Sequence, residues 1–163
     1  MPFDPSLGEE YVPSLEEILK DININSPTQF KEAILEKGRE LYNKSEIKQI
    51  KGEDFILCDS SDFYKTLVNL GHGSAAMTVF DDSSPEKYFL IFKDKIPKNF
   101  YEIVAAHESC EYRQVKGGIG QPDAHLLATI EEIETAKRLG KDKDYFTFLK
   151  EKYPLKFEEM KNI

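Results

Sequence analysis

The pattern of hydrophobic and polar positions predicts helices in the first part of the chain. Apolar residues at helical spacing indicate a short amphipathic helix over residues 15–22 and a longer one over residues 27–43. Ser14 stands where a helix N-cap is favoured, and Pro27 suits the first helical position of the longer segment. Residues 1–13 contain three prolines, and we expect an irregular arm there.

Strand patterns occupy the middle of the chain. The apolar run at residues 55–58 follows Gly52 and predicts a strand, and the acids and serines behind it predict the start of a helix over residues 63–70. The runs at residues 75–80 and 87–93 are joined by a turn-rich segment, which predicts a β-hairpin. Together these runs predict a small antiparallel sheet of about three strands.

Helical patterns return in the C-terminal half of the chain. They cover residues 100–115, 122–139, 142–153 and 155–161. Glycines after the first of these segments supply its stop, and Pro154 divides the last two. We therefore expect an α+β fold, a single domain over residues 1–163 in which the small sheet packs against a helical layer.

Composition and charge exclude several classes of partner. The formal net charge is -8 and is spread along the chain, so most of the surface repels a phosphate backbone and we expect no nucleic-acid binding. No apolar run approaches the roughly 20 residues of a membrane span, and the first residues lack the pattern of a secretion signal. With two cysteines and no Cys-x-x-Cys pair, we expect a cytoplasmic protein without a membrane partner.

One short segment, HESCE at residues 107–111, gathers metal-binding side chains. The chain has three histidines, and a second one, His125, lies at the head of the next predicted helix. Residues four apart in a helix share a face, so His107 and Glu111 can both reach one metal ion. Glu108 points about 100° away from His107. We expect Glu108 to act as the general base on a water.

The next predicted helix adds candidate ligands. His125 lies two residues after Asp123, a suitable N-cap, and the positive end of the helix dipole there favours the neutral imidazole that a metal requires. Glu132 falls on the same helical face and is a candidate fourth ligand or a partner of the ligands. Two imidazoles and one carboxylate with an open position are the ligand set of a catalytic zinc site. With more carboxylates engaged, iron or manganese is an equal alternative.

At residues 107–111 the chain resembles the zincin-like metallopeptidases, whose motif is His-Glu-x-x-His on a helix that follows the edge of a small sheet. The resemblance covers residues 87–136. It implies that His107 is the first zinc ligand and Glu108 the catalytic glutamate. Glu111 stands where the family has its second histidine. A carboxylate at that position adds negative charge to the metal and weakens it as a Lewis acid.

The resemblance also implies a third ligand and a reaction. His125 completes the ligand set, or Glu132 does, as in members of the family whose third ligand is a glutamate on the next helix. We therefore expect a zincin-like, divalent-metal-dependent hydrolase that acts on a peptide or amide bond in a peptide or protein substrate. An inactive relative, or one with a different metal and reaction, is an alternative.

Other interpretations of the same residues stay open. The chain can be a non-catalytic acidic interaction module with a structural or vestigial metal site. His72 between two glycines is either a third imidazole or a loop residue without a chemical role. Cys110 is either a thiolate nucleophile near His107 or a small buried hydrophobe.

Overall fold

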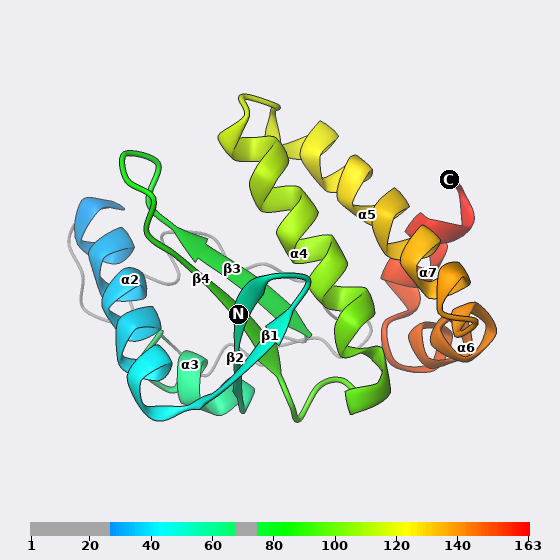
Figure 1. Cartoon of the computed structure of the whole chain (residues 1–163), viewed down its shortest axis with the longest axis horizontal. Helices are drawn as coiled ribbons and strands as arrows, with labels where there is room; N and C mark the ends of the chain where they lie inside the picture. Colours follow the sequence, from blue (N-terminus) through cyan, green and yellow to red (C-terminus); the bar gives the residue numbers. More distant parts are fainter. Residues whose placement is uncertain (1–26, 68–74) are drawn as a thin grey trace.

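The computed structural model describes residues 27–67 and 75–163, whose elements form layers around a small sheet (Figure 1). The sheet has four strands in the order β1-β2-β4-β3, which are β1 (Glu46–Ile50), β2 (Glu53–Cys58), β3 (Ala76–Phe80) and β4 (Lys87–Phe92). Helices α2 (Pro27–Lys44) and α3 (Ser60–Leu67) pack on one face of the sheet. The expected α+β class is confirmed. The predicted arm at residues 1–13, the helix at residues 15–22 and His72 lie outside the described residues.

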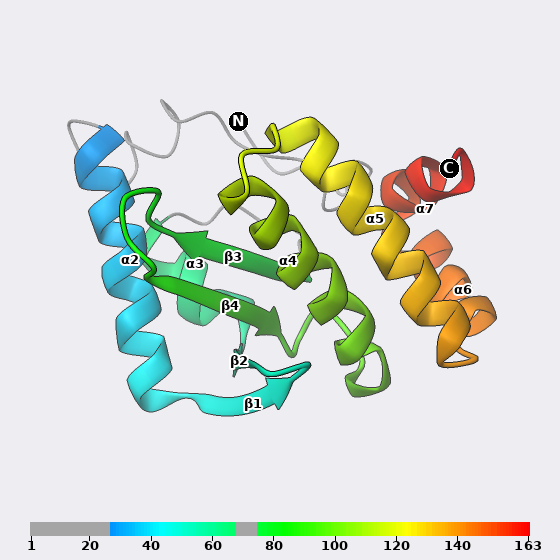
Figure 2. The same cartoon turned by 45° about the horizontal axis from the view of Figure 1, so that its top comes forward.

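The other face of the sheet carries the C-terminal helices. A 3-10 turn, η2 (Lys98–Phe100), leads into α4 (Tyr101–Lys116), which lies across β3 and β4 (Figure 2). The helices beyond α4 are α5 (Gln121–Arg138), α6 (Asp142–Lys152) and α7 (Pro154–Lys161). Their predicted bounds are confirmed to within a residue or two, because glycine and proline mark their ends.

The sheet is mixed, which corrects the prediction of a purely antiparallel sheet. Strands β1 and β2, and strands β3 and β4, pair antiparallel, but β2 and β4 run parallel, with Phe55 opposite Phe89. Strand β3 begins at the end of the sheet where β2 ends, with Ala76 opposite Ile91, and the β3–β4 hairpin then reverses the chain so that β4 runs in the same direction as β2. Antiparallel neighbours can be joined by a short turn, whereas parallel neighbours need a longer connection, which here contains both α3 and β3.

Burial on both faces explains the apolar runs of the two central strands. In β2, Phe55 and Leu57 face α4, whereas Ile56 and Cys58 face α2 and α3. Strand β4 alternates in the same way. Because side chains alternate between the faces of a strand, a strand covered on both sides is apolar at successive positions.

Strand β1 was not predicted, since its sequence EIKQI is largely polar. It is held at the edge of the sheet by a two-residue turn at Lys51 and Gly52, which have φ values of 55° and 80°. Two positive φ values are typical of a type I′ turn, whose twist matches that of an antiparallel hairpin. The register then pairs Ile50 with Glu53, and polar side chains suit an exposed edge.

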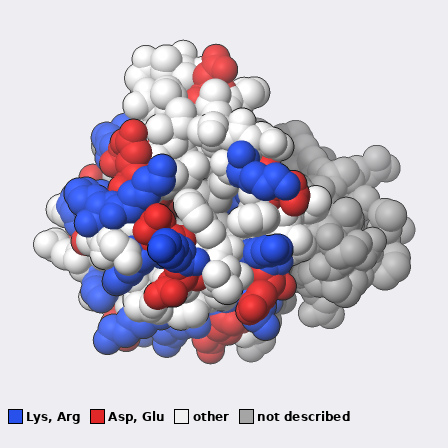
Figure 3. All heavy atoms as spheres, turned by 90° about the vertical axis from the view of Figure 1, so that its right-hand side faces the viewer, with Lys and Arg blue, Asp and Glu red and all other residues white. Residues whose placement is uncertain are grey.

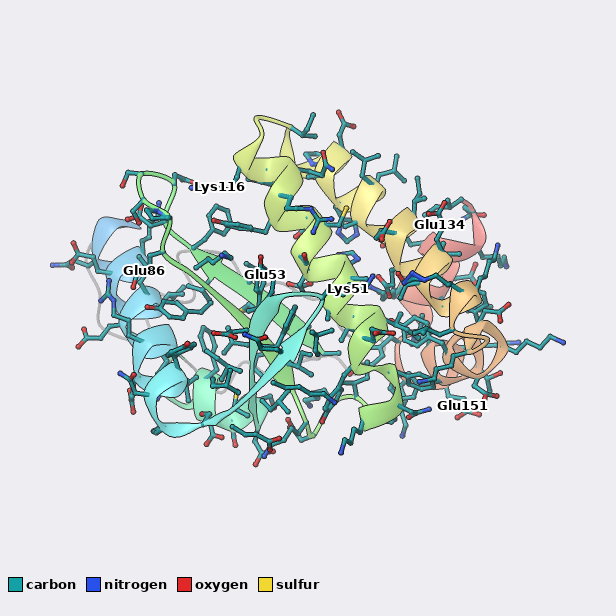
Figure 4. The ribbon with its side chains drawn as sticks, viewed as in Figure 1. Lys51, Glu53, Glu86, Lys116, Glu134 and Glu151 are labelled. Atoms are coloured by element: carbon teal, nitrogen blue, oxygen red, sulfur yellow. The ribbon has the colours of Figure 1, made fainter. Side chains whose placement is uncertain are left out.

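Long side chains tie the helical layer to the sheet. The Lys116 ammonium, at the end of α4, donates to the backbone oxygens of Asp81 and Ser84 in the β3–β4 loop, each at 3.1 Å. Figure 4 shows Lys116 beside that loop. At the other end of the layer, the Tyr153 hydroxyl donates to the Lys95 carbonyl at 2.8 Å and fixes the junction of α6 and α7. These contacts hold both ends of the layer that carries the predicted metal ligands.

Charged side chains of both signs are mixed on the face formed by the right-hand side of Figure 1 (Figure 3). Lysines and arginines lie beside aspartates and glutamates there, and neither sign gathers into one large patch. Within the described ranges, no helix combines the length and apolarity that a bilayer span requires.

Candidate metal centre

Three predicted ligands converge where α4 meets α5. Oε2 of Glu111 lies 3.6 Å from Nε2 of His107 and 3.0 Å from Nδ1 of His125. One ligand atom from each of the three residues lies within 4.8 Å of those of the other two. His107 is buried, and the carboxylate of Glu111 is half-buried. The i and i+4 positions of α4 therefore share one face, as expected, and the α4–α5 turn brings His125 to that face.

The spacing of these atoms fits a zinc-sized ion. Zinc binds imidazole nitrogen and carboxylate oxygen at about 2.0–2.2 Å, so two tetrahedral ligands of one ion lie roughly 3.4 Å apart. The distances of 3.0 and 3.6 Å from Glu111 bracket that value. The donor set of two imidazoles and one carboxylate also suits iron and manganese. The residues present thus offer the donor types of a divalent-ion site, with ligand atoms within 4.8 Å of one another.

Glu132 lies behind His107. Its Oε1 atom is 2.7 Å from Nδ1 of His107 and 3.0 Å from the Lys156 ammonium, and the Tyr145 hydroxyl donates to its other oxygen. Glu132 is fully buried. Because Nδ1 and Nε2 are distinct positions on the imidazole ring, Glu132 contacts the side of His107 that faces away from Glu111. Glu132 therefore lies beside the candidate ligand His107, a position compatible with a partner of that ligand, one of the two roles predicted for it.

His125 contacts a second carboxylate in a similar way. While Nδ1 of His125 faces Glu111, its Nε2 lies 2.7 Å from Oε1 of Glu159 on α7. Each histidine therefore has one ring nitrogen toward the ligand cluster and the other against a glutamate. Metal-binding histidines typically donate their second N–H to a carboxylate, which fixes the tautomer and the orientation of the ring.

The charges at this centre favour protonated histidines when no metal is bound. Burial and the positive charge of Lys156 lower the pKa of His107, but Glu132 and Glu111 outweigh them and raise it to about 9. Burial raises the pKa of Glu132, and the positive charges of Lys156 and His107 reverse this and lower it to about 2. The pKa of Glu111 is likewise lowered, since the imidazoles of His107 and His125 beside it outweigh its burial.

The expected capping of α5 was wrong. The N-cap is Gly120, and Asp123 lies inside the first helical turn, so His125 is the fifth helical residue and lies beyond the strongest field of the dipole. The hydrogen bond to Glu111 raises the pKa of His125, and Glu159 adds to the increase. Glu111 and Glu159 therefore favour the protonated imidazole of His125, whereas the helix dipole was expected to favour the neutral imidazole.

Glu108 faces the sheet side of the same cavity. Its Oε1 accepts a hydrogen bond from the Thr78 hydroxyl on β3 at 2.9 Å. Burial raises the pKa of the Glu108 carboxyl, and the negative charge of Glu111 adds to this increase. A carboxylate with a raised pKa is a stronger base than one in water. The predicted general base is therefore fixed in position by β3 and lies on the wall of the cavity.

The cavity beside the centre has a volume of about 390 Å³. Its polar wall carries the three candidate ligands, Glu108, Glu132 and Lys156, and its apolar wall carries Ile96, Val104, Phe148, Leu149 and Tyr153. The residues of β3 from Ala76 to Thr78 line a further part. A cavity with converging polar groups on one wall and apolar side chains on the other is a candidate small-molecule or substrate site.

Sequence reasoning missed the side chains that support the centre from other elements. Thr78, Tyr145, Lys156 and Glu159 belong to β3, α6 and α7. In the sequence, no spacing rule relates them to residues 107–111. The alternation of β3 offers one weak signal, since Thr78 lies on the face opposite Val79, which packs toward α2.

Cys110 has the properties of a core residue. Its side chain is 6% exposed. Burial raises the pKa of its thiol, and the negative charge of Glu131 adds to the increase despite Arg113 nearby. A thiol with a raised pKa is a poor nucleophile at neutral pH. This favours the small buried hydrophobe over the thiolate nucleophile.

Searches against family models, curated proteins and solved structures find no match for this chain. The centre formed by His107, Glu111 and His125 is therefore interpreted from its geometry and chemistry.

Proposed function

We propose that the chain is a divalent-metal-dependent hydrolase of zincin-like type that cleaves a peptide or amide bond. The observation that supports this proposal is the convergence of His107, Glu111 and His125 within 4.8 Å of one another, on the wall of a cavity that also holds Glu108. Zinc is the ion that best suits these ligands, with iron or manganese as alternatives.

In this mechanism, α4 provides both metal ligands and the general base. His107 and Glu111 would hold the ion with His125, and Glu108 would take a proton from the attacking water and deliver it to the leaving nitrogen. A bound divalent ion supplies the Lewis acidity that activates a water and polarises the carbonyl. Thr78 fixes one oxygen of Glu108 at 2.9 Å, which keeps the carboxylate in place during proton transfer.

The test combines metal analysis with turnover. The full chain is purified without chelator, its zinc, iron and manganese are measured, and hydrolysis of labelled casein is followed before and after chelation and addition of zinc. The Glu108→Gln variant should keep the metal and lose at least about 100-fold in rate. Glu102→Gln on the same helix, outside the cavity lining, is the matched control and should keep both properties.

Two results would overturn parts of the proposal. A chain that binds none of these ions, and whose melting temperature does not change on their addition, lacks the metal centre. A chain that binds an ion but cleaves no peptide or amide substrate, with Glu108→Gln indistinguishable from the original, has a structural metal site. The second result would favour the interaction module over the hydrolase.

A further inference from the structure

We propose that Glu159, on the C-terminal helix α7, is a positioning residue that orients His125 for metal binding. The inference rests on the proposed metal centre and extends it to a third helix. Oε1 of Glu159 lies 2.7 Å from Nε2 of His125, while Nδ1 of the same ring lies 3.0 Å from Oε2 of Glu111. His125 therefore lies between two carboxylates that contact different ring nitrogens.

The chemistry of imidazole assigns different roles to these two carboxylates. A neutral imidazole carries one N–H, and its other nitrogen offers a lone pair. When Glu159 accepts the N–H of Nε2, the lone pair of Nδ1 points at Glu111, where the ion binds. Since Glu159 contacts the ring nitrogen that faces away from the ligand cluster, it acts on the ion through His125.

His125 needs the contact with Glu159 because its side chain is more exposed than that of His107. The side chain of His107 is 7% exposed, whereas that of His125 is 41% exposed. A half-exposed imidazole has several rotamers and both tautomers available, and each wrong one withdraws a ligand from the ion. The contact with Glu159 selects the one arrangement that completes the ligand set.

A glutamate also lies beside the second ring nitrogen of His107, with the ring nitrogens exchanged, as a close contact without the geometry of a hydrogen bond. There Nδ1 faces Glu132 at 2.7 Å, and Nε2 faces Glu111. Helix α7 contributes to both pairs, because Lys156 contacts Glu132 and Glu159 contacts His125. Residues three apart in a helix share a face, so one face of α7 supports both histidines. In Figure 2, α7 lies beside α5.

The test measures metal affinity in the full chain. Zinc affinity is determined by competition with a chromophoric chelator for the original protein, Glu159→Ala and Glu159→Gln. Glu159→Ala should bind zinc about 10- to 100-fold more weakly. Glu159→Gln should recover most of this loss, because the amide oxygen accepts the same hydrogen bond. Glu158→Ala is the matched control, since Glu158 is exposed and pairs with Lys161.

A second measurement follows the ring itself. Nitrogen NMR of the zinc-loaded protein should show His125 protonated at Nε2, and this signal should broaden or change in Glu159→Ala while the signals of His107 persist. Circular dichroism confirms that each variant is folded. Should Glu159→Ala fail to fold, the tautomer of His125 in the original protein and the affinity of Glu159→Gln decide the question.

The outcomes separate this inference from the proposed function. Equal zinc affinity in the original protein and a folded Glu159→Ala would overturn the role of Glu159 and leave the metal centre intact. A zinc-loaded His125 protonated at Nδ1 would overturn both the role of Glu159 and the place of His125 in the ligand set, because the nitrogen that faces Glu111 would then have no lone pair for the ion. Failure of the original protein to bind zinc, iron or manganese would overturn the metal centre itself. Loss of affinity in Glu159→Ala that Glu159→Gln restores supports the positioning role.

Discussion

The imidazole of His107 contacts the carboxylate of Glu132 at 2.7 Å, and both side chains are buried. The Lys156 ammonium lies 3.0 Å from the same carboxylate oxygen, and Tyr145 donates to the other. A buried carboxylate with three such partners is paired well enough to stay charged inside the protein. The side chain that contacts the candidate ligand His107 is therefore also a structural element of the core.

We predict that Glu132→Gln destabilises the metal-free protein by about 3 kcal/mol, because the variant leaves buried positive charge without its counter-ion. Urea unfolding followed by circular dichroism measures the change. Glu134→Gln on the exposed side of the same helix is the control and should stay within about 0.5 kcal/mol of the original. Equal stability of the two variants would contradict the prediction.

Stability of the metal-free protein should fall as the pH rises from 6.5 toward 8. The pKa of His107 is about 9 in the folded protein against 6.5 without its partners, so the folded state binds more protons in this range. The contribution of His107 is complete below pH 6.5 and is lost as the pH rises through 9. Urea unfolding in the presence of chelator measures this slope. In His107→Gln it should be markedly flatter, and an equally steep slope would argue against the charged imidazole.

Zinc should stabilise the protein, and more strongly at pH 8 than at pH 6. Metal ligands must lose their protons, and the raised pKa values of both histidines make protons compete with the ion at the lower pH. At a free zinc concentration of about 100 times the dissociation constant, the gain is about 2.7 kcal/mol. Thermal unfolding with and without zinc measures it. An equal gain at both pH values would show that the ion binds elsewhere.

Thr78→Val should shift the pH dependence of turnover. The Thr78 hydroxyl lowers the pKa of Glu108, and its loss raises that pKa further. Because the general base must be deprotonated, the acid limb of the pH–rate profile should move to higher pH. Thr78→Ser keeps a hydroxyl and should restore the original profile. An unchanged acid limb in Thr78→Val would place the titrating base elsewhere.

Gly38→Ala should destabilise the fold although alanine favours helices. A Cβ at this position in α2 would lie 2.6 Å from Cδ2 and 2.9 Å from Cγ of Tyr88. The clash should cost about 1–3 kcal/mol, which exceeds the gain in helix propensity of about 1 kcal/mol. In a Tyr88→Ala background those ring atoms are absent, so Gly38→Ala should become neutral or stabilising there. Chemical unfolding of the four proteins measures the coupling.

The sequence alone predicted the features of the fold and the site that depend on neighbouring residues in the chain. The spacing of His107 and Glu111 placed both on one helical face, and the glycines after Lys116 brought α5 back beside α4. Glycine and proline also marked the ends of the C-terminal helices. These features depend on neighbours within one or two turns of the chain, which the order of residues reveals directly.

The remaining features depend on contacts between distant segments. Strand β1 is polar, and only pairing with β2 makes it a strand. Glu159 lies 34 residues after His125, and Thr78 lies 30 residues before Glu108. Glutamates and threonines are common on protein surfaces, so neither residue differs from a solvated one in the sequence. The packing of β3 and α7 against α4 and α5 decides their contacts.

The candidate ligands lie on neighbouring helices, whereas Glu159 lies on a later one, and this sets the order in which they can come together. His107, Glu111 and His125 belong to one helical hairpin, α4 and α5, so closing a short loop is enough to bring them together. Glu159 joins only when the last helix docks, after the chain has passed through α6. During synthesis, an ion bound as proposed would therefore meet an incomplete centre first and gain the contact through Glu159 only when α7 docks.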